Sequence, residues 1–344
     1  MCSQPLSIGQ FISGDRTIVW AGLILLALAA PSPLAAQTAA FSDSAAMLSK
    51  SCAADIIATC RGANFDGTTL KDCLNRNQDV VSAQCKADYP KAFDAIQKRV
   101  AARATVGREC EYEIVRTCRG KATDVSNSLT CLLAMPNVSA RCNRAIGDVG
   151  YKVTDDIATR LSALDDSPEL DLTKLRQQVA DRSKGRPEPP SQRRAPIALE
   201  LMKLPSLNLD IQFDTDTPIV LPESYAKLGQ VADTLVNSAL LNSTFLVVGH
   251  TASGGRRDNN VLLSQRRANA VRDILINTFK ISSKRLQSVG LGEEQLLDAA
   301  RPSAAVNNQT QIMTIAKISE QDQQAAAATA TGVAPAKKKS AKKR

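Results

Sequence analysis

The sequence predicts an α+β protein, with a disulfide-stapled, all-helical N-terminal module followed by an α/β sandwich as the C-terminal domain. Two observations lead to this prediction. Eight cysteines between residues 48 and 150 fall into two sets with nearly the same spacing. From about residue 207, stretches with strand-like alternation take turns with stretches of helical periodicity. The 344 residues suffice for two modest domains with connectors.

Residues 1–36 are expected to be a secretory signal peptide. Arg16 precedes an apolar run of 13 residues, 18–30, and small residues at 34–36 offer a cleavage site. The run is short for a membrane span, and an uncleaved N-terminal anchor is the alternative. No later stretch is long and apolar enough to cross a membrane. We therefore expect a mature chain that is soluble after cleavage of the signal peptide.

The cysteines reveal an internal duplication within residues 48–150. Successive cysteines are separated by 8, 13 and 12 residues in the first set and by 8, 13 and 11 in the second. The flanking segments 55–62 and 113–120 also match each other. The two sets are Cys52, Cys60, Cys73 and Cys85, and Cys110, Cys118, Cys131 and Cys142.

An even cysteine set in an exported chain indicates disulfides. Each unit is expected to be two helices joined by a glycine-containing loop, which places the inner cysteines near the turn and the outer ones near the open end. This arrangement favours a nested pairing, although the sequence alone leaves three pairings open for each unit. The nested pairs are Cys60–Cys73 with Cys52–Cys85, and Cys118–Cys131 with Cys110–Cys142. No metal site is expected, because the spacing is wrong for zinc and the chain has one histidine.

The spacing resembles the cysteine-rich repeat first recognised in Golgi-apparatus proteins, over about residues 52–145. This resemblance implies a small helical module stapled by disulfides and says little about a ligand. We interpret residues 48–150 as a structural scaffold, with a dedicated binding site as the alternative.

Residues 151–204 are expected to form a helical connector and a linker. Apolar residues recur at helical intervals over 151–182, and Pro168 interrupts the pattern. Residues 183–196 are polar and rich in proline, which indicates a semi-rigid linker and a domain boundary.

Residues 205–320 are expected to form a small α/β sandwich. The pattern predicts strands at 207–213, 241–249, 286–289 and 311–318, and helices at 222–239 and 260–279. The helix at 260–279 follows the segment Val-Gly-His-Thr at 248–251, and carries Leu263, Ser264, Arg267 and Ala268 in an ordered series. Together these motifs resemble the signature of OmpA-like C-terminal domains over about residues 207–318. The resemblance implies a periplasmic module that binds the diaminopimelate of peptidoglycan stem peptides.

The resemblance also implies which residues bind the ligand: Arg267, Asn260, Thr251 and the residue at position 252. A guanidinium can bind a carboxylate through two hydrogen bonds, and a carboxylate is needed for the ammonium group. The family has aspartate where this chain has Ala252, and its late Asn-Arg-Arg motif is altered at 307–309. Asp258 is an alternative carboxylate in the same turn. In another interpretation, Arg267 is only a cation on the helix surface.

Other classes of function are disfavoured. Aromatic residues make up 3% of the chain, too few for surfaces that stack on nucleic-acid bases. His250 is the single histidine, and no nucleophile motif accompanies it, so we expect neither an enzyme nor a cofactor. Residues 321–344 are expected to be a disordered tail. Its six positive charges within 337–344 could bind an anionic envelope surface or only aid solubility.

The sequence therefore predicts a periplasmic envelope protein that binds peptidoglycan non-covalently and tethers its helical module to the cell wall. The alternative is an adaptor for protein–protein interactions in the envelope, whose OmpA-like domain has lost its wall ligand.

Overall fold

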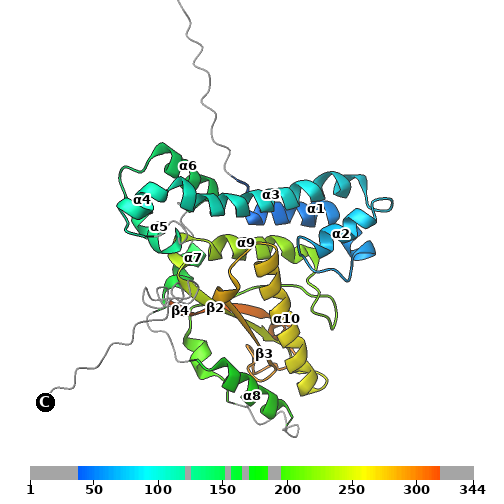
Figure 1. Ribbon diagram of the computed structural model, residues 1–344. Helices are drawn as coiled ribbons and strands as arrows, with labels where there is room; N and C mark the ends of the chain where they lie inside the picture. The colour runs from blue at the N-terminus through cyan, green and yellow to red at the C-terminus, as the bar shows by residue number, and fades with distance from the viewer. Residues whose placement is uncertain (1–37, 121–124, 152–155, 165–169, 185–194, 318–344) are drawn as a thin grey trace, which may run out of the picture. The chain divides into compact units, whose positions relative to one another are not determined.

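Helices make up the first part of the chain and a four-stranded sheet the last (Figure 1). The computed structural model describes residues 38–120, 125–151, 156–164, 170–184 and 195–317, all of which belong to one unit, Ala35–Arg344. The expected signal peptide, most of the proline-rich linker and the basic tail lie outside the described residues. Among the helices that are described, none is both long enough and apolar enough to span a bilayer.

The two cysteine units contain three helices each rather than the two that were expected, because the loop between the inner cysteines leads into a short extra helix. Ser82 and Ser139 cap the third helix of the two units. Each side chain accepts a hydrogen bond from the amide of the cysteine three residues later, Cys85 and Cys142 respectively. The duplication therefore extends to the hydrogen bonds. The helices are α1 (Phe41–Thr59), α2 (Thr69–Arg76), α3 (Ala83–Glu109), α4 (Glu111–Arg116), α5 (Val125–Ala134) and α6 (Ala140–Val149).

Four disulfides staple these helices, in the nested arrangement. In each unit the outer bond joins the first and fourth cysteines, and the inner bond joins the second and third. The bonds are Cys52–Cys85, Cys60–Cys73, Cys110–Cys142 and Cys118–Cys131.

The sheet has the strand order β1-β4-β2-β3. Strands β2 and β3 are parallel, whereas β4 runs antiparallel to both β1 and β2. The strands are β1 (Ser206–Asn208), β2 (Ser243–His250), β3 (Leu286–Gly292) and β4 (Thr310–Lys317), and the helices between them are α9 (Tyr225–Leu235) and α10 (Arg257–Asn277). Short 3₁₀ turns occur at Leu199–Lys203, Pro222–Ser224, Ser238–Leu240, Ser283–Arg285 and Ala305–Asn307.

Two predicted elements are shorter than expected. The strand predicted at 207–213 ends at Asn208, because further on the Gln212 amide donates to Ser224 Oγ rather than to the neighbouring strand. The helix predicted at 222–239 is divided into a 3₁₀ turn, α9 and a second 3₁₀ turn. Asn237 causes the second break, since its side chain caps the new turn by accepting from the Ala239 amide.

Helices cover both faces of the sheet. Phe245 and Val247 of β2 face the cluster that includes α9 and α10, whereas Leu246 and Val248 face a second cluster. This alternation explains why β2 is a nearly continuous apolar run. The second cluster contains Leu172, Leu175 and Val179 of α8 (Leu172–Ser183). The segment expected as a connector, which also includes α7 (Asp156–Ser162), therefore packs on the sheet.

The first cysteine unit packs against α9, and α1 runs along that helix (Figure 1). The two backbones approach so closely that a Cβ atom at Gly229 would lie 2.6 Å from the Phe41 carbonyl oxygen. Asp233 of α9 accepts hydrogen bonds from the amides of Phe41 and Ser42, which satisfies the exposed donors at the start of α1. Gly229 and Asp233 of α9 thus form the contact site for the start of α1.

Candidate functional site

A cavity of about 510 Å³ opens beside the C-terminal end of β2. Its walls come from the loop after β1, the turn after β2, one face of α10 and the segment before β4. The lining residues are Ile211, Gln212, Phe213, Thr215, Asp216, Thr251, Ala252, Ser253, Gly254, Asn260, Leu263, Arg267, Ser303 and Asn308. The four residues that the sequence singled out as ligand-binding, Thr251, Ala252, Asn260 and Arg267, all lie in this wall.

The turn that carries Ala252 is braced by two asparagines. The Ala252 amide donates to Asn308 Oδ1 at 2.9 Å. Asn260 Nδ2 donates to the Gly254 carbonyl at 2.9 Å and to Glu293 Oε2 at 2.7 Å. Asn308 thus contributes to the site even though it belongs to the altered late motif. Asn260 holds the turn in shape from the first turns of α10.

Thr251 belongs to the cavity wall. Its side chain is buried, and Oγ1 has no hydrogen-bond partner within the part of the chain that the structure describes. A buried polar atom without a partner is costly. Because this hydroxyl is buried, Thr251 shapes the cavity wall rather than offering an accessible hydrogen-bonding group.

Arg267 projects from α10 and is held from one side. Its Nε donates to the Thr217 carbonyl at 3.1 Å, and its guanidinium carbon lies 4.9 Å from the centre of the Phe213 ring. No other hydrogen bond of this guanidinium occurs among the described residues. Burial lowers the pKa of Arg267, and the negative charge of Asp216 partly opposes that shift. The group is a half-buried cation whose terminal nitrogens remain available to a carboxylate.

Asp216 is an acidic residue of the cavity wall that the sequence motifs did not indicate. It lies in the loop between Phe213 and Val220, where it adopts a left-handed backbone conformation with φ of 55°. Aspartate is among the few residues that tolerate this conformation. The available sequence signal was the acidic segment 214–216, which directly follows the expected strand.

The segment that contains most of this cavity matches a known protein family. Residues 212–310 match the OmpA family. This part of the chain is an OmpA-family domain, and the cavity lies within it.

Curated relatives align with the same part of the chain. Outer membrane porin F of Pseudomonas aeruginosa is 35% identical over 118 residues, which are 34% of this chain and 32% of that protein. Outer membrane protein Omp38 of Acinetobacter baumannii is 32% identical over 101 residues, 29% of this chain and 28% of that protein. The chain thus spans about a third of the length of these relatives, which are outer-membrane proteins by name.

Among solved structures, the peptidoglycan-associated lipoprotein of Burkholderia pseudomallei is 27% identical, with a TM-score of 0.25. The alignment covers 33% of this chain and 91% of that one.

Asp258, the alternative carboxylate suggested by the sequence, is engaged outside the cavity. Its carboxylate forms an ion pair with Arg256, and it is not among the residues that line the cavity of the OmpA-family domain. Within that lining, Asp216 is the one acidic side chain.

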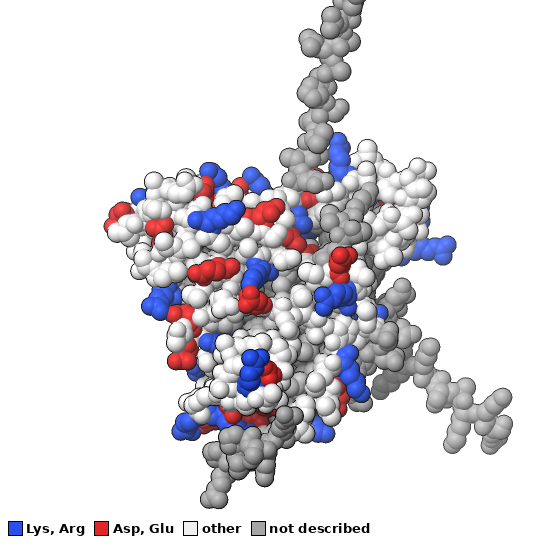
Figure 2. Space-filling model, turned by 180° about the vertical axis from the view of Figure 1, so that it is seen from behind, with Lys and Arg blue, Asp and Glu red and all other residues white. Residues whose placement is uncertain are grey.

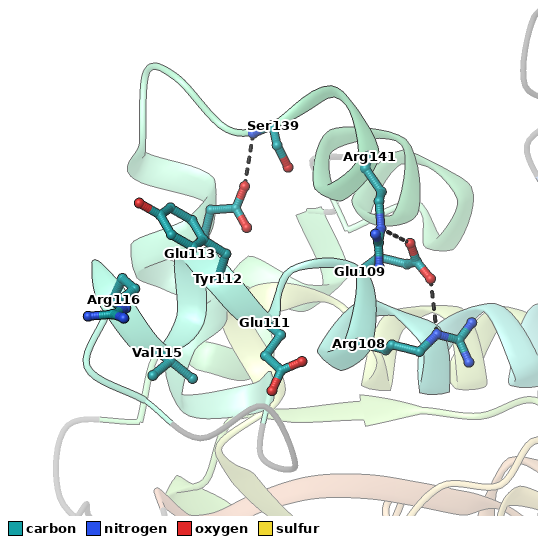
Figure 3. A pocket seen from close by; sticks show the side chains of 9 residues that line it. All are labelled: Arg108, Glu109, Glu111, Tyr112, Glu113, Val115, Arg116, Ser139 and Arg141. Carbon is teal, nitrogen blue, oxygen red and sulfur yellow. Dashed lines mark hydrogen bonds and ion pairs between the residues drawn. The ribbon is translucent and has the colours of Figure 1, made fainter.

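A second cavity, of about 610 Å³, lies beside α4 in the second cysteine unit (Figure 3). Most of its charges are already used: Glu109 pairs with Arg108 and Arg141, and Glu113 accepts from the Ser139 amide. Tyr112 and Val115 are exposed along its wall. This cavity therefore offers surface for contact, and two of its three acidic side chains, Glu109 and Glu113, are engaged within the unit.

His250 is a structural residue of the OmpA-family domain. Its imidazole is buried at the end of β2, where Nδ1 donates to the Gln295 carbonyl at 2.9 Å. Burial lowers the pKa of His250, against the opposing effect of its hydrogen bonds. Over the described ranges, no group of three or more histidine, cysteine, aspartate or glutamate residues is arranged to hold a metal ion.

Charges of both signs are mixed over the face seen in Figure 2, where lysine and arginine side chains alternate with aspartate and glutamate. A nucleic-acid interface usually presents a basic patch or stripe. This face has the mixed pattern of an ordinary solvated surface.

Proposed function

We propose that this chain is a periplasmic envelope protein that binds peptidoglycan non-covalently through its OmpA-family domain. Through that contact, the disulfide-stapled helical module is tethered to the cell wall. The ligand is the zwitterionic end of diaminopimelate in a stem peptide, and Arg267 binds its carboxylate. Thr251 and the turn at Ala252 form the wall beside it, and Asn260 supports the turn.

The observation that supports this proposal most strongly is the state of Arg267. Its guanidinium lies in a cavity with the other three expected residues, and its single hydrogen bond within the described chain uses Nε. The two terminal nitrogens suit a carboxylate, which arginine binds through paired, charge-assisted hydrogen bonds.

Sedimentation of the full chain with purified sacculi tests the proposal. We expect the wild-type chain to co-sediment and Arg267→Ala to lose most of its binding. Arg266→Ala is the matched control, because Arg266 is exposed on the same helix and does not line the cavity. Equal binding by wild type and Arg267→Ala, or no binding by either, would contradict the proposal.

The alternative function is an envelope adaptor whose OmpA-family domain no longer binds the wall. Ala252 favours it, since the missing carboxylate removes a charged hydrogen bond, a loss of roughly 1.5–3 kcal/mol. Tyr112 is 73% exposed and lines the second cavity, where its ring offers a contact for a protein partner. Failure of the wild-type chain to sediment with sacculi, together with capture of an envelope protein that Tyr112→Ala abolishes, would favour the adaptor.

The basic tail and the signal peptide enter the proposal as predictions from the sequence. Six positive charges in residues 337–344 would add attraction to an anionic envelope surface at low ionic strength. A chain lacking residues 337–344 should then bind anionic vesicles less tightly at low ionic strength, about 0.01 M, where attraction between charges extends over roughly 30 Å. The difference between the two chains should shrink as salt is added and screens this attraction. Equal binding by both chains would assign the tail to solubility alone.

A further inference from the structure

A zwitterionic ligand needs a negative group as well as Arg267. The family has aspartate directly after its Gly-His-Thr segment, and this chain has Ala252 there. An alanine cannot bind an ammonium group, and burying that ammonium without a partner would be costly. The cavity must therefore supply a carboxylate from another element if it holds such a ligand.

We propose that Asp216 supplies this carboxylate and binds the ammonium group of the ligand whose carboxylate is bound by Arg267. The inference rests on the proposed function and assigns one residue of the site. The negative partner has thus moved from the turn after β2 to the loop after β1, across the cavity.

The position of Asp216 suits this role. Asp216 and Arg267 line the same cavity, yet within the described chain no ion pair joins their side chains. A direct ion pair would neutralise both groups, whereas their separation leaves room for a ligand that carries both charges. The carbonyl of the next residue, Thr217, accepts from Arg267 Nε and so fixes the loop relative to the arginine.

Neighbouring carboxylates are engaged elsewhere. Asp214 forms a two-pronged ion pair with Arg61, and Asp258 pairs with Arg256. Glu293 accepts from Asn260 and lies 3.7 Å from Arg257. Asp216 is exposed and is the acidic residue that faces the cavity.

The first cysteine unit holds the loop that carries Asp216. Arg61 binds Asp214 near the start of the loop, and Asn64 binds the backbone of Pro218 and Val220 near its end. Asn64 Oδ1 accepts from the Val220 amide at 2.8 Å, and its Nδ2 donates to the Pro218 carbonyl at 3.3 Å. A loop held at both ends can present a carboxylate with little loss of entropy on binding.

The test uses the full chain and two probes: a muropeptide that carries meso-diaminopimelate with a free side-chain amino group, and the same muropeptide with that amino group acetylated. Titration calorimetry measures both affinities. The substitution is Asp216→Asn, which removes the charge and retains a residue type that tolerates the left-handed backbone. Asp258→Asn is the control, since it removes a neighbouring charge outside the cavity.

We expect wild type and Asp258→Asn to prefer the free amine, and Asp216→Asn to bind it at least about tenfold more weakly. The preference over the acetylated probe should also disappear in Asp216→Asn, which a merely structural role would not cause. Adding Ala252→Asp to Asp216→Asn should restore it.

The failures are distinguishable. If wild type binds neither the sacculi nor the muropeptide, the proposed function and this inference both fail. If wild type binds and Asp216→Asn keeps the same affinity or the same preference for the free amine, the inference alone is overturned.

Discussion

Arg61 of the first cysteine unit binds Asp214 of the OmpA-family domain through two hydrogen bonds. Nε donates to Oδ2 at 2.9 Å and Nη2 donates to Oδ1 at 2.7 Å. Asp214 lies two residues before Asp216, in the loop that borders the Arg267 cavity. The helical unit therefore contacts the loop that contributes Phe213, Thr215 and Asp216 to the cavity wall, and we expect changes in that unit to alter ligand binding.

Loosening this loop should weaken binding as well as folding. Asn64→Ala removes the acceptor of the Val220 amide and should lower the free energy of unfolding by about 1 kcal/mol. It should also lower sacculus affinity about three- to tenfold, because the ligand must then order the loop. Urea unfolding and sacculus sedimentation measure the two effects.

Arg76→Ala is the control for this prediction, because Arg76 is an exposed arginine on α2 of the same unit. It should leave both quantities unchanged. An Asn64→Ala chain that is destabilised but binds sacculi as tightly as wild type would show that the loop does not need this support.

The inner disulfide of the first unit should matter for binding in a way that its counterpart does not. Cys60–Cys73 closes the loop that carries Arg61 and Asn64, and Cys118–Cys131 closes a loop of the same sequence separation, 13, in the second unit. Replacing either pair by serine should cost roughly 3 kcal/mol of stability in the chain-entropy model. Only loss of Cys60–Cys73 should also weaken binding to sacculi.

The matched loop lengths make this comparison informative. Thermal unfolding should show similar losses for both double variants, while sedimentation below their unfolding temperatures separates them. Equal sacculus binding by the two variants would mean that the first unit does not act through the loop at 213–220.

The sequence was sufficient to predict features that depend on local order. The nested disulfides agree with the pairing that the expected antiparallel helices favoured, although the cysteine spacing alone left three pairings open for each unit. Residues 251–267 form a turn and a helix that bring Thr251 and Arg267 into one cavity wall. The OmpA-family domain at 212–310 also agrees with the motif-based resemblance.

Features that depend on packing between distant segments were missed. Asp216 reaches the cavity only because the loop at 213–220 folds toward α10, where Thr217 meets Arg267 across 50 residues of sequence. The close contact between α1 and α9 depends on Gly229. A single glycine within a helical pattern gives no indication of which backbone will approach it. Such contacts have no periodic signal along the chain.

Asp233 should be a major stabilising residue between the first cysteine unit and α9. Its carboxylate accepts from the Phe41 and Ser42 amides and lies 3.2 Å from Arg99, whose side chain is 9% exposed. Asp233→Ala would leave that buried charge and two amides without their partner. We expect a loss of roughly 3–5 kcal/mol in the free energy of unfolding, measured with urea.

Asp94→Ala provides the comparison for Asp233. Asp94 pairs with Lys98 along α3, but both side chains are well exposed, at 62% and 71%. Such a pair contributes less than about 1 kcal/mol. Similar losses for the two variants would indicate that the contact between α1 and α9 contributes little to folding.

The single histidine should make the protein less stable in mild acid. Burial lowers the pKa of His250 in the folded chain, so the unfolded chain takes up a proton first as the pH falls below its ordinary value of about 6.5. The stability contributed by the neutral imidazole is fully present above that pH, and is lost as the pH falls toward the folded pKa. Urea unfolding between pH 7.5 and pH 5.5 (roughly one unit on either side of 6.5) should show this loss.

His250→Gln isolates the contribution of the imidazole. Glutamine can donate to the Gln295 carbonyl but does not titrate, so the variant should be less stable at neutral pH and should lose less of its stability on acidification. Carboxylates that are hydrogen-bonded in the fold, such as Glu113, titrate at lower pH, because their pKa values are lowered by those bonds despite the opposing effect of burial. A wild-type chain whose stability is level across this interval would show that the folded protein accommodates the protonated imidazole, with its hydrogen bonds to Gln295 and Gln311 outweighing burial.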